Sequence, residues 1–306
     1  MSRPRNSTNS SEEDVLSDLL TVEHAGMFLL VNVVMVCSVT SFLGIIANAI
    51  NLAVFVKQGL HNTINICFLG LAISDMCCLL TLLWISICMN PLVISSGVPW
   101  VATDFTYLTG AWPHHISGRI TSYITVYITA ERCLCIIFPL KVRQIMTPTI
   151  TTVALCLIYI INILMLCPEY VTLYLDWTYF PAYNSTLLAI HYLEGREKAS
   201  GLVYFLNSAS GLIAFVSVAV LTPILAVKLK EASAWRAKSK SANIRDAMSN
   251  RDQKTVKMVV LIATVLIICF TPGVVFGTVT FIEPEFDINK RYANTVASLW
   301  TIACIS

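Results

Sequence analysis

The chain alternates between long apolar runs and short polar links. An apolar run of about 20 residues can cross the hydrocarbon core of a bilayer as a helix. Six runs reach that length, and a seventh of roughly 15 residues begins near the last residue and would cross only part of the core. The pattern predicts an all-α bundle of seven transmembrane helices with the seventh helix truncated at the C-terminus. The expected spans are 27–56, 64–89, 104–138, 149–172, 202–227, 256–282 and 292–306.

The composition agrees with a protein that lives in a lipid bilayer. Of the 306 residues, 56% are hydrophobic and 12% are charged, whereas soluble domains carry roughly 25% charged residues. The net charge of +2 is small, and no nucleic-acid partner is expected. Residues 1–26 are polar and acidic and lack the charged-then-apolar start of a secretory signal. The first apolar span is therefore expected to insert as its own anchor.

Basic residues in alternate links set the orientation, because cytoplasmic loops carry the excess of Lys and Arg. This places the N-terminus outside, in a multi-pass protein of the plasma membrane. Three Asn-x-Ser/Thr glycosylation acceptors, at Asn6, Asn9 and Asn184, all fall on the predicted outer side. The expected organisation is an extracellular glycosylated tail over 1–26 and a helical membrane domain over 27–306.

The third span is the least apolar, and a polar helix of this kind belongs in the middle of a bundle. Near its inner end stand Glu131 and Arg132. Intramembrane ions are costly and usually functional, so this pair is a candidate switch. At about 100° per residue, one face of the helix carries His114, Gly118 and Thr121 in line with Arg132.

Four motifs stand in order along the chain, each at the appropriate depth. They are Asn48 in GIIANAINLAVF, Asp75 in LGLAISD, Glu131-Arg132-Cys133, and Cys269-Phe270-Thr271-Pro272. Together they resemble the rhodopsin-like family of G-protein-coupled receptors over nearly the whole chain. The resemblance implies a receptor that passes an extracellular small-molecule or peptide signal to a heterotrimeric G protein. The run AERCLCIIFPLKVRQIMT further resembles invertebrate, gastropod-type chemosensory and neuropeptide receptors.

The resemblance implies that Asp75 binds a sodium ion that helps to couple two receptor states. Asn48 and Thr121 are its expected neighbours. The alternative is that Asp75 is a hydrogen-bonded structural group, since a carboxylate at mid-helix must be protonated, hydrated or paired. No other cofactor and no metal is expected.

The candidate ligand residues lie toward the outer side. His114 occupies the depth where amine receptors place an acid, which disfavours an amine ligand. The alternative is that neighbouring groups simply satisfy the hydrogen bonds of the His114 side chain. Gly118 shares its face, and Trp177 and Phe270 complete the candidate set.

Arg119 points away from that face, and an arginine so deep cannot be left to lipid. We expect it to face the fourth or fifth helix. Pairing with Glu169 is the favoured role, and contact with an acidic ligand group is the alternative.

On the inner side, Pro272 removes a helical hydrogen bond and permits a hinge. Asp252 either holds Arg132 in the resting state or is a solvated acid. The basic link 228–257 either contacts anionic lipid or also frames the G-protein site.

The chain departs from the family pattern at the outer mouth and at its end. Tyr107 stands where the family places a disulfide cysteine, and the loop 173–200 contains no cysteine. Packing of the loop's aromatic residues is expected to replace the disulfide, and pairing of Cys88 with Cys167 stays open. The chain stops at Ser306, before the family's Asn-Pro-x-x-Tyr segment, which suggests a fragment or an incomplete gene model.

Other functions fit less well. An enzyme would need a nucleophile or metal motif, and neither His-Glu-x-x-His nor a phosphate loop is present. A retinal protein would need a lysine in the last span, which has none. A transporter should show broken helices in related halves. The alternatives kept are a polytopic transporter and a non-signalling receptor fragment.

Overall fold

The structure is a computed structural model that describes residues 22–138, 142, 144–181, 184–238, 245–282, 294–296 and 298–299. Within these ranges six helices are long and apolar enough to cross a membrane, and they match the six complete spans predicted from the sequence. The predicted seventh span lies mostly outside the described residues. The predicted helical membrane architecture is confirmed. The six candidate spans are Glu23–Gln58, Thr63–Cys88, Ala102–Ile137, Pro148–Tyr170, Gly201–Glu231 and Val256–Val275.

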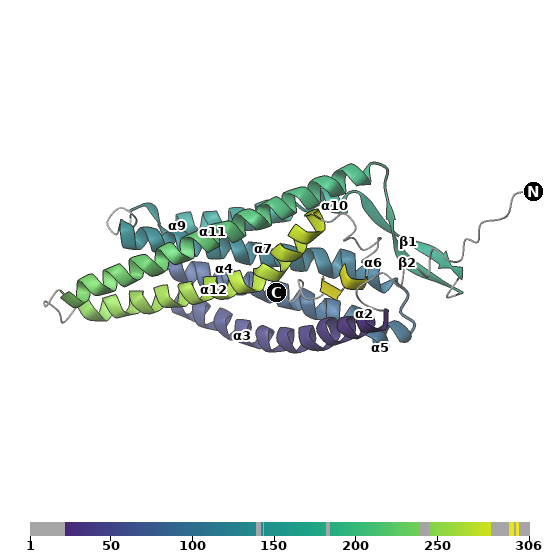
Figure 1. Cartoon of the computed structure of the whole chain (residues 1–306), viewed down its shortest axis with the longest axis horizontal. Coiled ribbons are helices and arrows are strands. Elements are labelled where there is room, and N and C mark those ends of the chain that lie inside the picture. The colour runs from purple at the N-terminus through teal and green to yellow at the C-terminus, as the bar shows by residue number, and fades with distance from the viewer. Residues whose placement is uncertain are drawn as a thin grey trace, which may run out of the picture. The chain divides into compact units, whose positions relative to one another are not determined.

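The chain divides into two compact units. The smaller consists of Met1–Val39 with Cys269–Ser306, and the larger is Thr40–Ile268. Figure 1 labels the elements along the chain. They are α2 (Val22–Leu29), η1 (Leu30–Val36), α3 (Cys37–Gln58), α4 (Thr63–Cys88), α5 (Pro91–Ser95), α6 (Ala102–Thr106), η2 (Tyr107–Ala111), α7 (Trp112–Ile137), α9 (Pro148–Leu164), α10 (Cys167–Tyr170), β1 (Leu173–Phe180), β2 (Ser185–Tyr192), α11 (Arg196–Lys238) and α12 (Arg245–Ile282).

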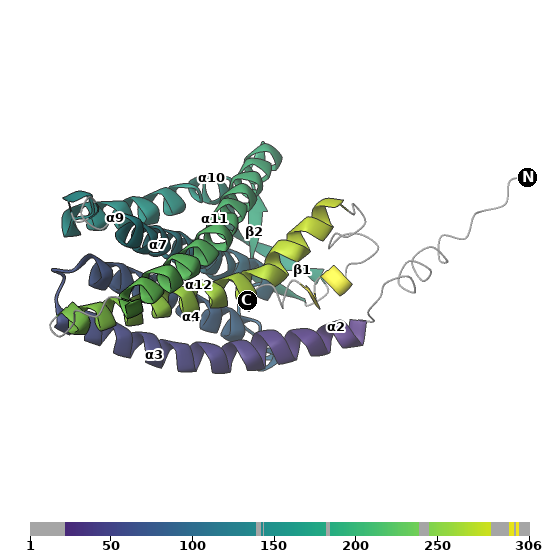
Figure 2. The same cartoon turned by 60° about the vertical axis from the view of Figure 1, so that its left-hand side comes forward.

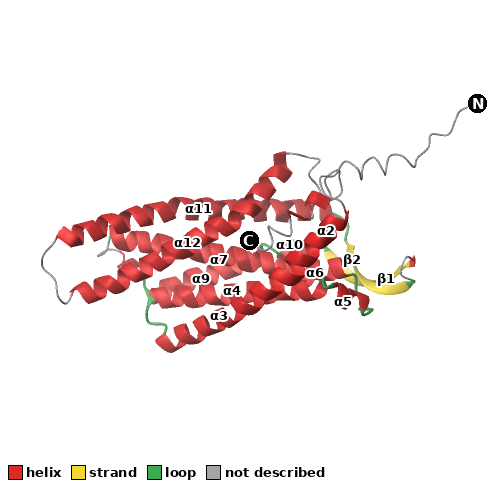
Figure 3. Cartoon of the chain, turned by 60° about the horizontal axis from the view of Figure 1, so that its bottom comes forward, coloured by secondary structure: helices red, strands yellow, loops and turns green. Residues whose placement is uncertain are grey.

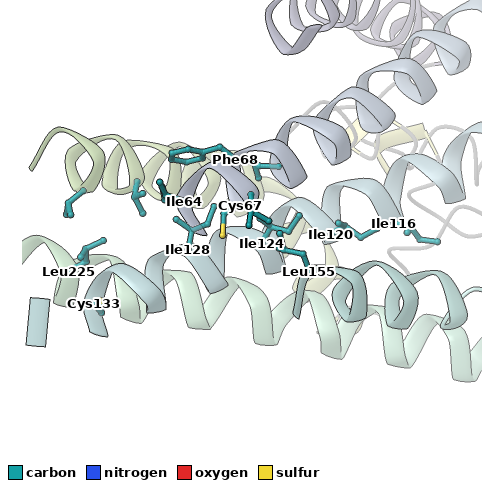
Figure 4. Close-up of a cluster of buried hydrophobic side chains, with 14 residues drawn as sticks. Ile64, Cys67, Phe68, Ile116, Ile120, Ile124, Ile128, Cys133, Leu155 and Leu225 are labelled. Carbon is teal, nitrogen blue, oxygen red and sulfur yellow. The ribbon is translucent and has the colours of Figure 1, made fainter. Parts of the chain in front are cut away.

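Within the larger unit, α7 packs against α4, α9 and α11, an arrangement that can be followed in Figures 2 and 3. Ile120, Ile124 and Ile128 follow one another at four-residue spacing, which places them on one face of the helix. All three are buried, and Figure 4 shows them in the same cluster as Cys67 of α4 and Leu155 of α9. The prediction that the third span is central is confirmed.

The polar residues of α7 are tolerated because the helix satisfies many of them itself. Hydroxyl groups of Ser117, Ser122, Thr125 and Thr129 each donate to the carbonyl four residues earlier, at 2.7–2.9 Å. In lipid, an unsatisfied polar group costs several kcal/mol. These local hydrogen bonds let a chain of hydroxyls line the centre of the bundle.

The loop after the fourth span is a β-hairpin, which the sequence did not lead us to expect. Strands β1 and β2 pair antiparallel, from Leu173 opposite Tyr192 to Phe180 opposite Ser185. Leu188 of β2 exchanges backbone hydrogen bonds with the segment before α6, and Asp104 accepts from the backbone N–H of Ile190 at 3.0 Å. The hairpin is thereby fixed to the outer end of the third span.

The aromatic packing that we expected to hold this loop is present only in part. Tyr174 stacks on His191 of the facing strand, with ring centroids 5.6 Å apart, but most of the expected aromatic side chains that the structure describes are exposed. Tyr174, Trp177 and Tyr179 are 46%, 59% and 57% exposed, and Tyr183 lies outside the described residues. The backbone ladder of the hairpin supplies the order that we had assigned to side chains, because a paired ladder satisfies the polar groups of both strands.

Gly110 marks the closest approach between η2 and α4. A Cβ atom at this position would lie 2.7 Å from Cγ1 of Ile85, which is itself buried. We expect Gly110→Ala to destabilise the protein by about 1–3 kcal/mol through overpacking and so to lower its thermal unfolding midpoint. The control is Gly211→Ala in α11, where no atom lies within 4 Å of the new Cβ. Equal midpoints for the two variants would contradict the close packing.

Candidate functional site

The predicted switch at the inner end of α7 is a three-residue hydrogen-bonded group. Nη2 of Arg132 donates to Oε1 of Glu131 at 2.8 Å, and the Thr63 hydroxyl donates to the same oxygen at 2.7 Å. Glu131 is 1% exposed, and the Arg132 side chain is 13% exposed. Thr63 is the first residue of α4, so the carboxylate also lies at a helix N-terminus, which favours negative charge. We call Thr63, Glu131 and Arg132 the inner switch.

Glu131 and Arg132 of the inner switch were predicted from the sequence, but Thr63 was not. Nothing in the sequence near Thr63 points to Glu131, which is 68 residues away. The side chain of Asp252 lies outside the described residues, so the proposed resting-state lock stays a prediction.

At mid-depth, the Thr121 hydroxyl donates to Oδ1 of Asp75 at 2.7 Å, which agrees with the expected neighbour. The hydroxyl of Ser74 lies 2.9 Å from that of Thr121 and extends the group. The amide of Asn48 instead donates to the carbonyl of Gly44 in its own helix at 3.1 Å. A role for Asn48 beside Asp75 therefore stays a prediction.

A half-buried carboxylate with two neighbouring hydroxyls fits a hard cation, which prefers oxygen ligands. Asp75 would supply the charge, while Thr121 keeps lone pairs free after donating its proton. A bound sodium ion would neutralise Asp75 within the bundle. Asp75, Ser74 and Thr121 are thus the residues suited to hold it.

The outer part of α7 faces α4. Nδ1 of His114 lies 3.0 Å from the carbonyl oxygen of Cys78 and 3.4 Å from its sulfur. A Cβ on Gly118 would come no closer than 4.0 Å to that sulfur. His114 therefore has hydrogen-bonding partners within the bundle, which agrees with the alternative that its neighbours satisfy it. Its contact with a ligand stays a prediction.

Arg119 faces α11, as expected for the fifth helix. It is 4% exposed, and its Nη1 donates to the backbone carbonyl of Asn207 at 3.4 Å. The predicted pairing with Glu169 is wrong. Glu169 contacts Tyr107, twelve residues before Arg119, and this separation is about 18 Å along a helix at 1.5 Å per residue. An arginine side chain cannot span that distance.

Glu169 instead belongs to a cluster at the end of the bundle that the charge pattern predicts to face outward. Its Oε1 accepts from Nη2 of Arg196 at 2.7 Å and from the Tyr107 hydroxyl at 2.6 Å, and Glu169 is fully buried. Arg196 also donates to the Tyr107 oxygen at 3.2 Å and lies over the ring of Tyr192. We call these four residues the outer clamp. It joins η2, α10, the end of β2 and the start of α11.

The charge of Arg196 is favoured by this environment. Burial alone would lower the pKa of its guanidinium, but the Glu169 carboxylate and the Tyr107 hydroxyl raise it more, so the pKa lies above its ordinary value. The outer clamp contains Tyr107, the residue found in place of the family's disulfide cysteine. Cys88 and Cys167, whose pairing we had left open, are free thiols.

The remaining candidate residues lie outside the groups described above. Trp177 lies on β1 and is exposed. Phe270 and Pro272 belong to the smaller unit, where α12 continues past Pro272. Asn184 is exposed at the hairpin turn with φ of 45°. The acceptors Asn6 and Asn9 lie outside the described residues.

The helical bundle, with its six candidate spans among the described residues, a carboxylate at mid-depth and a glutamate–arginine pair at one end, agrees with the class of membrane receptors that the sequence resembles. The sequence model of the family described as "7 transmembrane receptor (rhodopsin family)" matches residues 47–306. The chain belongs to this family.

Two similar proteins carry galanin names. The "Galanin-like G-protein coupled receptor npr-9" of Caenorhabditis elegans is 27% identical over 127 residues, covering 41% of this chain and 28% of that protein. The "Galanin receptor 2b" of Danio rerio is 25% identical over 243 residues, covering 78% of this chain and 59% of that protein. The chain thus spans less than two thirds of either relative. Both relatives carry the names of receptors, in agreement with the family match. The gastropod-type resemblance stays a prediction.

The outer clamp is held by an ion pair and hydrogen bonds. We therefore expect the thermal stability of the protein to depend on this ion pair and not on redox conditions. Glu169→Gln should lower the thermal midpoint, because breaking a buried ion pair costs about 3–5 kcal/mol. A reducing agent should leave the midpoint of the parent protein unchanged. The control is Glu231→Gln, whose partner Lys228 is 41% exposed and whose pair is worth about 0–1 kcal/mol. A fall in midpoint on reduction would contradict this account.

The cation site at Asp75 predicts a sodium response. Replacing potassium with sodium should raise the thermal midpoint of the purified parent protein, since a ligand that binds the folded state stabilises it. Asp75→Asn should abolish that rise because it removes the charge that holds the ion. Asp176→Asn, on the exposed hairpin, should keep it. Identical sodium titrations for Asp75→Asn and the parent would reject the site.

Proposed function

We propose that the protein is a receptor that converts binding of an extracellular ligand into activation of a heterotrimeric G protein at its cytoplasmic end. The observation that carries this proposal is the inner switch. It holds a buried carboxylate and a nearly buried arginine together at the inner end of the central helix. Family membership supports it, since the rhodopsin family is a family of receptors.

The geometry suggests how the switch works. In the resting state Glu131 holds Arg132, and Thr63 holds Glu131. A ligand that binds more tightly to a state in which these contacts are broken shifts the population toward that state. Arg132 then presents its N–H donors to the cytoplasmic partner, and the guanidinium remains charged throughout.

The ligand class is an extracellular peptide, with a small molecule as the alternative. Two relatives are named as galanin-type receptors, and His114 disfavours an amine. Exposed aromatic residues of the hairpin, Tyr174, Trp177 and Tyr179, suit peptide contact because they combine large apolar area with a polar tip.

The proposed arrangement in the cell follows the charge pattern. The N-terminal tail over 1–26 and the hairpin lie outside the plasma membrane, and the 27–306 domain spans it. Membership in a receptor family supports signalling over transport, over catalysis and over the non-signalling alternative.

The inner switch can be tested without knowing the ligand. In the full-length receptor reconstituted with G protein, Thr63→Val should raise ligand-independent nucleotide exchange about two- to fivefold, because losing one hydrogen bond to a charged group costs about 1.5–3 kcal/mol and only part of it is specific to the resting state. Adding Arg132→Ala should abolish that exchange at an equal amount of folded, reconstituted receptor.

Thr152→Val is the matched control, because Thr152 is exposed on α9 and its hydroxyl donates to the Pro148 carbonyl of its own helix at 2.9 Å. It should leave exchange near the parent level. Undiminished exchange in the double variant would remove Arg132 from the mechanism.

A further inference from the structure

Arg119 is a buried cation with no carboxylate partner among the described residues. It is 4% exposed, and its one recorded hydrogen bond is the 3.4 Å contact of Nη1 with the Asn207 carbonyl. Its Nε and Nη2 have no partner. Arg132 and Arg196, by contrast, each form an ion pair at 2.7–2.8 Å with a buried glutamate.

The surroundings offer hydrogen-bonding groups but no compensating charge. The side-chain oxygen of Asn207, a residue 5% exposed, is also without a partner. An amide oxygen can accept a hydrogen bond but cannot neutralise a guanidinium. One turn further inward, Tyr123 and Ser210 hydrogen-bond to each other at 2.9 Å. Glu169, the acid that we had expected to pair with Arg119, forms its ion pair with Arg196.

The two unpartnered nitrogens have a specific geometry. Nε and Nη2 lie on the same edge of the guanidinium, where their N–H bonds are parallel and match the two oxygens of a carboxylate. A lone buried charge is costly, and an ionisable residue inside a membrane bundle marks a ligand or ion site by default. The unpartnered edge of Arg119 is therefore suited to a planar, bidentate anion.

We propose that Arg119 is the subsite for a carboxylate group of the ligand, bound edge-on by Nε and Nη2 between α7 and α11. This inference rests on the proposed receptor function and narrows its ligand class to peptides or small molecules that present a carboxylate at this depth. A free halide has the charge but not the two-oxygen shape.

Purified receptor in lipid nanodiscs tests the subsite by thermal unfolding. Acetate and benzoate, titrated at constant sodium, should raise the parent midpoint by about 2 °C or more, a shift typical of one modest interaction. The neutral analogues acetamide and benzamide should not. Arg119→Gln should lose the response, and Arg119→Lys should retain only part of it, since a lysine cannot form the fork.

The ligand-free variants give a second readout. Arg119→Gln should unfold at or above the parent midpoint because it removes an uncompensated charge. Arg196→Gln should unfold below it because it breaks an ion pair, while keeping the carboxylate response. This contrast between a paired and an unpaired arginine separates a ligand subsite from a structural role.

Three results would overturn the subsite. They are no carboxylate response in the parent, an equal response in Arg119→Gln, and an equal response to sodium chloride added in place of the carboxylate salt, which would indicate a free-anion site. The thermal readout needs no G protein. Loss of nucleotide exchange with an intact carboxylate response would therefore refute the signalling function and not the subsite.

Discussion

The need to satisfy polar groups inside a bilayer governs this protein, and α7 is where the need is greatest. Its serine and threonine hydroxyls return to carbonyls of their own helix. Groups that cannot be satisfied locally connect the third span to its neighbours: Thr121 of α7 to Asp75 of α4, Glu131 of α7 to Thr63 of α4, and Tyr107 of η2 to Glu169 of α10. These three connections occur at different depths. The central helix is therefore linked to its surroundings by polar contacts over most of its length.

The two buried carboxylates differ in what surrounds them. Glu131 bonds to an adjacent arginine and to a helix N-terminus, so its contacts can be exchanged by a small change at the inner end of the bundle. Glu169 joins groups from separate elements and has no exposed surface, so breaking it would disturb the whole outer mouth. In the receptor mechanism that we propose, this difference suits a rigid ligand entrance combined with a movable inner end.

Much of the architecture follows from hydropathy, but element ends do not. The second span, predicted as 64–89, is a helix over Thr63–Cys88. The fifth begins at Arg196 and not at 202, and α12 begins at Arg245 and not at 256. Hydropathy detects where a helix enters the hydrocarbon region, whereas both of these helices continue into water. The hairpin was not predicted because the segment 173–200 was treated as a loop between two spans, held by its aromatic residues.

Residues of the site could be predicted from the sequence only where a charged side chain stands out within an apolar span. Asp75 and the Glu131–Arg132 pair stand out because charge is rare in apolar spans. The partnership of Glu169 with Arg196, 27 residues apart, depends on how α10 and α11 pack. No local pattern encodes that packing, and for the same reason Arg119 was assigned the wrong acid.

The hairpin has a further consequence for how receptor molecules meet one another. Strand β2 is bonded on both sides, to β1 and, through Leu188, to Trp100, whereas within the described residues β1 has β2 as its one partner strand. An unpaired strand edge is a template for pairing with another chain. Asp176 on this strand is exposed and opposes such pairing through its charge. A glycan on Asn184, at the tip of the same hairpin, would add bulk there, so that a single sugar attachment could help to keep neighbouring receptors from joining edge to edge.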